Sequence, residues 1–249
     1  LSVLKHIEYE TWFALAEFID NAVDSYLKNE KILKQIEGDD FVLDVRVEIN
    51  EPENKITIRD NACGIGEADY SRAFRAAEVP PDNSGLSEFG MGMKSAACWF
   101  ADNWCVTSTA LGETQLKKVS FDMKKIFEDK LEELDVEINS CDKNYHFTIV
   151  ELFDVNRMPR RKGVGKVKDH LRSIYREFIR KGVLKLTLNN EELKFEDPSA
   201  VIYNRLKRNY MGHETLECKV LWDEAKRSKL KTVGATVKNS DIQVSHCQL

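Results

Sequence analysis

The succession of helix and strand patterns along the chain constrains its fold most. Residues 11–26 repeat apolar side chains at helical spacing, with Leu15, Phe18, Ile19, Ala22 and Tyr26 on one side. Strand-like runs follow at 41–49 and 55–59, separated by the turn residues of 51–54. Because strands and helices are mixed without strict alternation, we expect an α+β fold with helices on one face of a sheet.

The rest of the chain continues this mixture up to about Pro198. The patterns predict three further strands, two short helices, one longer helix and a hairpin that turns at Asn189-Asn190. In order, these lie at 70–77 (helix), 94–101 (helix), 104–110, 116–122, 147–153, the segment after Arg157 (helix) and 183–195. Beyond Pro198 the pattern weakens, so we expect one domain over 1–197 and the incomplete start of a second domain, or a C-terminal extension, over 198–249.

Composition excludes several classes of protein. With 249 residues, 42% hydrophobic and 32% charged, the chain can bury a sizeable core and is not a disordered chain. Its net charge of -5 argues against a wholly nucleic-acid-binding surface, and its 6 cysteines form no C-x-x-C pair. No apolar run is long enough to span a bilayer. We expect an intracellular protein of a reducing compartment, cytoplasmic or, in a eukaryote, nuclear.

Four polar side chains lie within the first predicted helix, on the side opposite its apolar residues: Glu17, Asp20, Asn21 and Asp24. Carboxylate and amide oxygens are hard ligands suited to Mg²⁺, which bridges readily to phosphates. A carboxylate near such an ion can also deprotonate an attacking water. Taken alone, however, an acidic stripe of this kind is more often a solvated helix face.

The segment 60–66, Asp-Asn-Ala-Cys-Gly-Ile-Gly, directly follows a predicted strand. Gly64 and Gly66 let the backbone bend tightly and approach a flat ligand closely. The Asp60 carboxylate at the strand end can accept a hydrogen bond from an exocyclic amine, such as that of adenine. The same residue types also suit an ordinary strand-to-helix turn, so this segment alone leaves both interpretations open.

A glycine-rich segment, Gly-Met-Gly-Met-Lys-Ser at 90–95, opens a predicted helix. Exposed backbone N–H groups at a helix N-terminus form a site for anions. Lys94 adds a positive charge suited to phosphate, and Ser95 adds a hydroxyl donor. The spacing is neither that of a P-loop nor that of a dinucleotide fingerprint. The preceding loop, 79–88, has a flexible composition and could close over a bound ligand.

In this order and setting, the motifs resemble those of the GHKL ATPase superfamily, which spans DNA gyrase, heat-shock-ninety chaperones, histidine kinases, MutL-type mismatch-repair proteins and MORC proteins. The segments that resemble its four boxes are AEFIDNAVDSY (16–26), ITIRDNACGIG (56–66), SEFGMGMKSA (87–96) and TIVELFDV (148–155). The resemblance covers about residues 4–195. It implies the Bergerat ATP-binding fold, a two-layer α+β sandwich with a mixed, largely antiparallel sheet and helices on one face.

The resemblance also implies a role for each matching residue. Glu17 would be the general base that activates water, and Asn21 the Mg²⁺ ligand. Asp60 would read the adenine amine with Thr148 beside it, and Gly64 would line the base pocket. The phosphates would be held by the third box, under a lid formed by 79–88, through Gly90, Gly92, Met93, Lys94 and Ser95. Asp20 and Asp24 match the first box, but a structural role stays open for both.

Lys94 after Gly-x-Gly resembles the MORC-like, MutL-like and heat-shock-ninety-like branch more than the histidine kinases. The five histidines sit singly, and we interpret them as ordinary polar or core residues: His6, His146, His170, His213 and His246. A basic stripe on the helix after Arg157 would suit DNA phosphates: Lys168, Arg172, Arg176 and Arg180. Acidic residues interleave with this stripe and favour a solvated face, so DNA is a possible but not a favoured partner.

The resemblance implies binding of Mg-ATP and slow hydrolysis, used as a conformational switch with an ATP-dependent homodimer. Two alternatives stay open: a nucleotide-binding sensor or scaffold without useful hydrolysis, and a MutL-like DNA-associated clamp. Three departures from the family pattern are present. Ala62 stands where many members have the first glycine of the second box, which is a mild change, and the lid is short. No residue after Pro198 matches the lysine that many members contribute from a second domain, and this departure bears on hydrolysis.

Overall fold

The computed structural model describes residues 10–74, 92–129 and 134–195, together with four strands between residues 204 and 247. The chain divides into two compact units, Leu1–Phe195 and Glu196–Leu249. Each unit is described by itself. The assignment of the second one as the start of a further domain stays a prediction.

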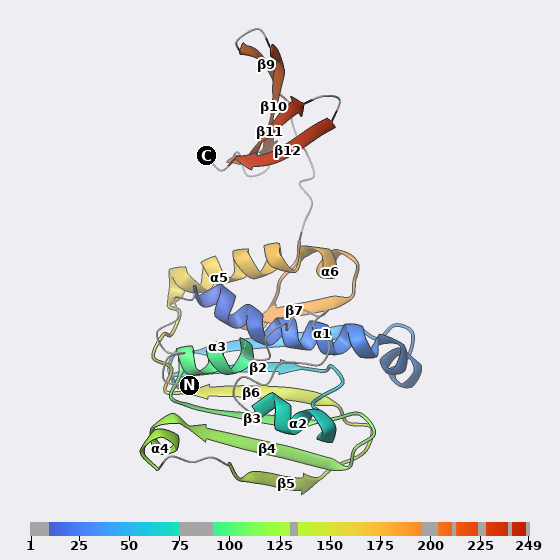
Figure 1. The fold of residues 1–249 in the computed structure, drawn as a ribbon, viewed down its shortest axis with the longest axis vertical. Helices are drawn as coiled ribbons and strands as arrows, with labels where there is room; N and C mark the ends of the chain where they lie inside the picture. Colours follow the sequence, from blue (N-terminus) through green and yellow to red (C-terminus); the bar gives the residue numbers. More distant parts are fainter. Residues whose placement is uncertain are drawn as a thin grey trace. The chain divides into compact units, whose positions relative to one another are not determined.

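The first unit is built on one eight-stranded sheet with the order β5-β4-β3-β6-β2-β1-β7-β8 (Figure 1). Every neighbouring pair is antiparallel except β1 and β7, which run parallel. The strands are β1 (Leu43–Asn50), β2 (Lys55–Asp60), β3 (Asn103–Thr109), β4 (Gln115–Asp122), β5 (Val136–Ser140), β6 (Phe147–Phe153), β7 (Leu184–Leu188) and β8 (Glu191–Glu192). The expected mixed, largely antiparallel sheet is therefore confirmed.

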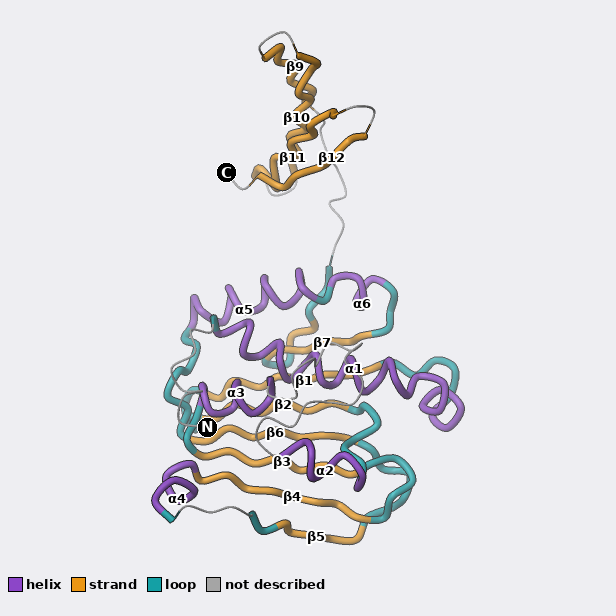
Figure 2. Tube along the Cα trace, viewed as in Figure 1, coloured by secondary structure: helices purple, strands orange, loops and turns teal. Residues whose placement is uncertain are grey.

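Helices α1, α2 and α3 lie in front of this sheet, on one face (Figures 1 and 2). The helices of the described residues are α1 (Thr11–Glu37), α2 (Glu67–Phe74), α3 (Gly92–Phe100), α4 (Met123–Glu128), α5 (Arg161–Ile174) and α6 (Arg176–Arg180). The α+β class and the helical layer on one face are confirmed. No helix of the described residues is long and apolar enough to cross a membrane.

The core lies between this helical layer and the sheet. The predicted apolar side of the first helix is buried there, since Leu15 and Ile19 are fully buried and Phe18 is 4% exposed. Alternate residues of β1 face it from the sheet, as the burial pattern of that strand shows. Burying one such side chain contributes about 1.5–3 kcal/mol, so this layer contact holds α1 firmly against the strands.

Helix α1 is longer than the sequence predicts. The expected helix ends at Tyr26, whereas α1 continues through a polar, lysine-rich stretch to Glu37. Leu33 is fully buried and anchors this extension. Two i,i+4 ion pairs support its surface, at 2.8 Å between Lys28 and Asp24 and at 2.6 Å between Lys34 and Glu30. Tertiary burial of one leucine therefore outweighs the polar composition.

Other boundaries also differ from expectation. The predicted helix at 70–77 begins three residues earlier as α2, and its last residues lie outside the described part of the chain. The helix after Arg157 is divided at Tyr175 into α5 and α6, because the backbone there leaves helical geometry, with φ -93 and ψ 12. Strand β5 and helix α4 are not predicted at all. The Asn189-Asn190 hairpin is confirmed, with φ of 48 and 62 at these residues.

The second unit contains a four-stranded antiparallel sheet in the order β12-β11-β10-β9. Its strands are β9 (Asn204–Tyr210), β10 (His213–Asp223), β11 (Ser228–Lys238) and β12 (Asp241–Cys247). The sequence pattern beyond Pro198 predicts none of them. Alternation of apolar and polar residues is nevertheless present over 216–220 (Leu-Glu-Cys-Lys-Val) and 242–245 (Ile-Gln-Val-Ser), so this strand signal was overlooked.

Candidate functional site

A cavity of about 240 Å³ lies among α1, α3, β2 and β6. Residues from all four sequence motifs line it: Asn21, Asp60, Gly64, Gly92, Met93, Lys94 and Thr148. Three of the candidate residues are not among the described residues that line the cavity. Glu17 contacts the start of α3 beside it, Ser95 is buried within α3, and Gly90 lies outside the described residues together with the loop 79–88.

Asp60 lies at one end of the cavity, at the last position of β2. It pairs in register with Thr148 of β6, and its Oδ1 accepts a hydrogen bond of 2.9 Å from the Ala62 amide. Burial raises the pKa of Asp60 to about 7, although the amides of Ala62 and Thr148 and the charge of His146 act in the opposite direction. The cavity therefore holds a buried carboxyl group that titrates near neutral pH.

Gly64 shapes the turn after β2. Its φ of +75 lies in the left-handed region, and a Cβ added there would lie 2.0 Å from the carbonyl oxygen of Thr109. The turn is also tied to this end of β3 by a 3.0 Å hydrogen bond from the Leu111 amide to the Cys63 carbonyl. Only glycine permits both the backbone conformation and the close approach.

We expect Gly64→Ala to destabilise the protein by about 3 kcal/mol, because strain and overpacking act together. Gly112→Ala is the matched control, since Gly112 also has a positive φ of +86 but nothing lies within 4 Å of its added Cβ. That control is expected to cost about 1 kcal/mol. Urea unfolding measures both free energies, and equal losses would show that the contact with Thr109 is not restrictive.

Ser108 is a site residue that the sequence analysis missed. It is 1% exposed, donates a 2.9 Å hydrogen bond to the Phe147 carbonyl and accepts one of 2.9 Å from the Ile65 amide. Its Oγ also lies 3.1 Å from the Thr148 hydroxyl. Ser108 thus joins β3, β6 and the turn beneath Asp60. Only the strand register reveals this role, because the sequence shows just one polar residue within a strand.

The other end of the cavity is formed by the start of α3. A Cβ added at Gly92 would lie 2.0 Å from Oε2 of Glu17, so the Glu17 carboxylate lies directly against this helix N-terminus. Lys94 lines the cavity and is 3% exposed. The positive end of the α3 dipole and the lysine together make this end suitable for anionic groups, with a carboxylate beside them.

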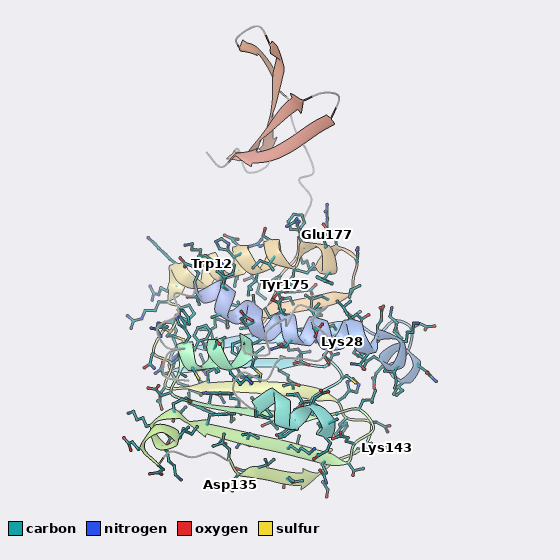
Figure 3. The ribbon with its side chains drawn as sticks, viewed as in Figure 1. Trp12, Lys28, Asp135, Lys143, Tyr175 and Glu177 are labelled. Atoms are coloured by element: carbon teal, nitrogen blue, oxygen red, sulfur yellow. The ribbon has the colours of Figure 1, made fainter. Side chains whose placement is uncertain are left out.

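Helix α1 contributes more to the cavity than its predicted part. The cavity is also lined by Asp24, which belongs to the first motif. Three further residues of α1 line it that were not expected to: Ser25, Lys28 and Asn29. Lys28, which Figure 3 labels beside α1, pairs with Asp24 at 2.8 Å. The sequence analysis missed Lys28 and Asn29 because it ended the helix at Tyr26.

Asp20, the remaining acidic residue of the first motif, is held from outside the cavity. The Tyr175 hydroxyl, between α5 and α6, donates to Asp20 Oδ1 at 2.7 Å and lies 3.1 Å from the Ala16 carbonyl (Figure 3). Burial raises the pKa of Asp20, and the bond from Tyr175 opposes that shift. Asp20 therefore connects α1 to the α5–α6 junction.

The polar groups of the cavity fit a magnesium ion that takes few protein ligands and is bound mainly by waters and substrate phosphates. Among the described residues, no group of three or more His, Cys, Asp or Glu side chains could hold a metal ion. Asn21 presents an amide to the cavity, on the helix that also carries Glu17. Mg²⁺ commonly takes only one or two protein ligands and completes its shell with waters and substrate phosphates.

The predicted basic stripe is paired with carboxylates. Arg172 contacts Asp169 at 2.7 Å, and Lys168 pairs with Glu191. Arg176 and Arg180 both lie near Glu177, at 3.9 and 3.5 Å. The break at Tyr175 also divides the stripe between α5 and α6. These contacts favour the solvated-face interpretation, and DNA binding stays an untested prediction.

The fold is an α+β sandwich, and residues of all four sequence motifs line the cavity between its helices and sheet. Residues 9–148 match the family model described as "Histidine kinase-, DNA gyrase B-, and HSP90-like ATPase". The chain therefore belongs to this ATPase family, the GHKL superfamily. The family match does not distinguish among its branches, so the MORC-like, MutL-like and heat-shock-ninety-like assignment stays a prediction. None of the curated proteins compared with the chain matches it.

Solved structures show the same fold at low sequence identity. The ATPase region of Saccharomyces cerevisiae topoisomerase II has a TM-score of 0.52 and 14% identity, covering 84% of this chain and 57% of that one. The ATPase and transducer domains of DNA topoisomerase II from Balamuthia mandrillaris have a TM-score of 0.54 and 12% identity, with coverage of 91% and 56%. The chain thus spans a little over half the length of these solved chains.

Proposed function

We propose that this chain binds Mg-ATP in the cavity between α1, α3 and the sheet, and hydrolyses it slowly. The observation that carries the proposal is the meeting of four separate sequence motifs around one cavity. A buried carboxyl group lies at one end of it, and a helix N-terminus with a lysine lies at the other. This polarity suits a molecule with a hydrogen-bonding base and an anionic tail.

At the base end, Asp60 is proposed to accept a hydrogen bond from the exocyclic amine of adenine, with the Thr148 hydroxyl beside it. Ser108 holds that hydroxyl at 3.1 Å. Gly64 lets the backbone turn lie close to the flat base. In a buried site, a carboxylate that accepts such a bond discriminates strongly against a base that presents a carbonyl there.

At the phosphate end, the first turn of α3 and Lys94 are proposed to hold the phosphates, together with Gly90, Met93 and Ser95. Asn21 is proposed to bind Mg²⁺, which neutralises phosphate charge when bound. Glu17 is proposed to orient and deprotonate the attacking water. Its carboxylate lies against Gly92, at the helix N-terminus where the phosphates are proposed to bind, and this contact supports the proposed role.

Nucleotide selectivity tests this proposal. Calorimetric titration in the presence of Mg²⁺ is expected to give an affinity for ATP at least about tenfold higher than for GTP, because guanine presents a carbonyl to Asp60. Phosphate release from ATP is expected to be slow and to stop when the metal is chelated. Equal affinities for the two nucleotides would contradict the assignment of Asp60.

We further propose that binding and hydrolysis operate a conformational and dimerisation switch, as in MORC-like or heat-shock-ninety-like ATPases. The family match supports this idea only at the level of the ATPase module. A sensor or scaffold without useful hydrolysis is the second candidate, since the proposed binding residues Asn21, Asp60 and Lys94 line the cavity whereas the proposed base, Glu17, does not. Turnover of the Glu17 variant, treated in the Discussion, separates these two functions.

A further inference from the structure

His146, the residue before β6, is buried directly behind the base end of the cavity. Its side chain is 6% exposed. The ring Nδ1 lies 2.8 Å from the carbonyl oxygen of Ala62, and Nε2 lies 3.3 Å from Oε1 of Glu37. The imidazole therefore joins the last residue of α1 to the turn that follows Asp60. The site described above assigns no role to this residue.

Both hydrogen-bond partners of His146 are acceptors. A carbonyl oxygen only accepts hydrogen bonds, so Nδ1 must carry a hydrogen towards Ala62. A carboxylate oxygen also only accepts, so Nε2 must carry a hydrogen as well in order to bond to Glu37. With a neutral ring, the lone pair of Nε2 would face the negative charge of Glu37. The geometry therefore points to an imidazolium, with a positive charge on the ring.

This charge lies next to Asp60 along the chain of hydrogen bonds. The Ala62 amide donates to Asp60, and the carbonyl of the same residue accepts from His146. The charge of His146 is among the influences that lower the pKa of Asp60 against the larger effect of burial. The other charged groups that face this cluster are Glu37 of α1 and Arg59 of β2, and the Phe41 ring lies 6.0 Å away.

We propose that His146 is a positioning residue for adenine recognition: its imidazolium fixes the turn after β2 and favours the ionised form of Asp60, which is proposed to accept the adenine amine. The inference rests on the proposed role of Asp60. It adds an electrostatic partner, contributed from the far side of the turn, without which a larger fraction of the protein near neutral pH would carry a protonated, non-accepting Asp60. Affinity falls in proportion to the competent fraction.

The test compares His146→Asn with the wild type across pH. Asparagine places an amide N–H near the position of Nδ1, so it keeps a donor for Ala62 but removes the charge. The probe is a non-hydrolysable ATP analogue with Mg²⁺, titrated calorimetrically. The measured quantity is the ratio of variant to wild-type Kd at each pH, in which protonation of the ligand phosphates cancels.

If the loss of charge raises the pKa of Asp60 by about one unit from its value near 7, affinity falls about tenfold at about pH 6.5. At about pH 8.5 Asp60 is largely ionised in both proteins, so the ratio is expected to stay within about twofold. A ratio that is the same at both pH values, whether one or larger, would overturn the inference, because packing alone does not depend on the charge of Asp60.

Two further variants keep the test decisive. Glu37→Gln removes the carboxylate that favours the imidazolium and is expected to give a smaller loss with the same pH dependence, even if His146→Asn does not fold. His170→Asn is the matched control, because His170 stacks on Trp12 at 3.9 Å and does not line the cavity. A ratio of one is expected for it at both pH values.

If the wild type binds no nucleotide, or Asp60→Asn binds as well as the wild type, the proposed function fails instead.

Discussion

Glu17→Ala is expected to lower ATP turnover by about 10²–10⁴-fold, the usual contribution of a positioned general base. The affinity for Mg-ATP is expected to change by about threefold or less, because the proposed role of Glu17 concerns the attacking water. Its carboxylate lies against the first residue of α3, where the phosphates are proposed to bind. Phosphate release at saturating ATP measures the first quantity, and calorimetry measures the second.

Glu30→Ala is the matched control for this experiment. Glu30 is on the same helix, pairs with Lys34 at 2.6 Å and does not line the cavity. Its replacement is expected to leave both turnover and affinity unchanged. If Glu17→Ala retains turnover, Glu17 is not the base. If the wild type binds ATP without measurable turnover, the sensor or scaffold function becomes the better account.

Asp60→Asn is expected to weaken Mg-ATP binding by about tenfold to a hundredfold, the effect of losing one hydrogen bond to a charged group. The replacement keeps the size of the side chain but removes the carboxylate that is proposed to accept a hydrogen bond from the adenine amine. Asp44→Asn is the control, since Asp44 pairs with Arg46 at 2.6 Å and does not line the cavity. Unchanged affinity in Asp60→Asn would contradict the proposed recognition of adenine by Asp60.

The same substitution has an opposite effect on the stability of the nucleotide-free protein. Burial raises the pKa of Asp60 to about 7, above its value in the unfolded chain, so the folded state binds this proton more tightly. The wild type therefore loses stability as pH rises from the unfolded pKa towards about 7. Asp60→Asn lacks this loss. Above neutral pH it is expected to melt no lower than the wild type, which separates weak binding from poor folding.

Sequence periodicity predicted the elements that are stabilised by regular burial. Leu15 and Ile19 repeat at helical spacing because α1 faces the sheet along one side, and both are fully buried. The extension of α1 escaped prediction because its composition is polar and its main anchor, Leu33, is a single buried residue. Strands β9–β12 escaped prediction although residues 216–220 and 242–245 alternate between apolar and polar side chains, a strand signal that the sequence does carry.

The residues of the candidate site likewise divide into those that could be predicted from the sequence and those that could not. Residues that lie within contiguous motifs, such as Asn21, Asp60 and Gly64, could be selected from their order along the chain, and the structure brings them to one cavity. Ser108 and His146 could not, because their contacts depend on strand register and on the close approach of α1 to the turn after β2. A lone serine in a strand, or a lone histidine before one, carries no local signal. The chemical roles of all these residues stay predictions.

The most direct test of the central claim, that the cavity binds Mg-ATP, is thermal melting with and without a non-hydrolysable ATP analogue and Mg²⁺. Ligand at about a hundredfold its Kd stabilises the folded state by about 2.7 kcal/mol. For a domain of this size, the melting midpoint is expected to rise by about 5–10 °C. An unchanged midpoint at millimolar ligand would contradict the account and leave this chain with the fold of an ATPase but no nucleotide site.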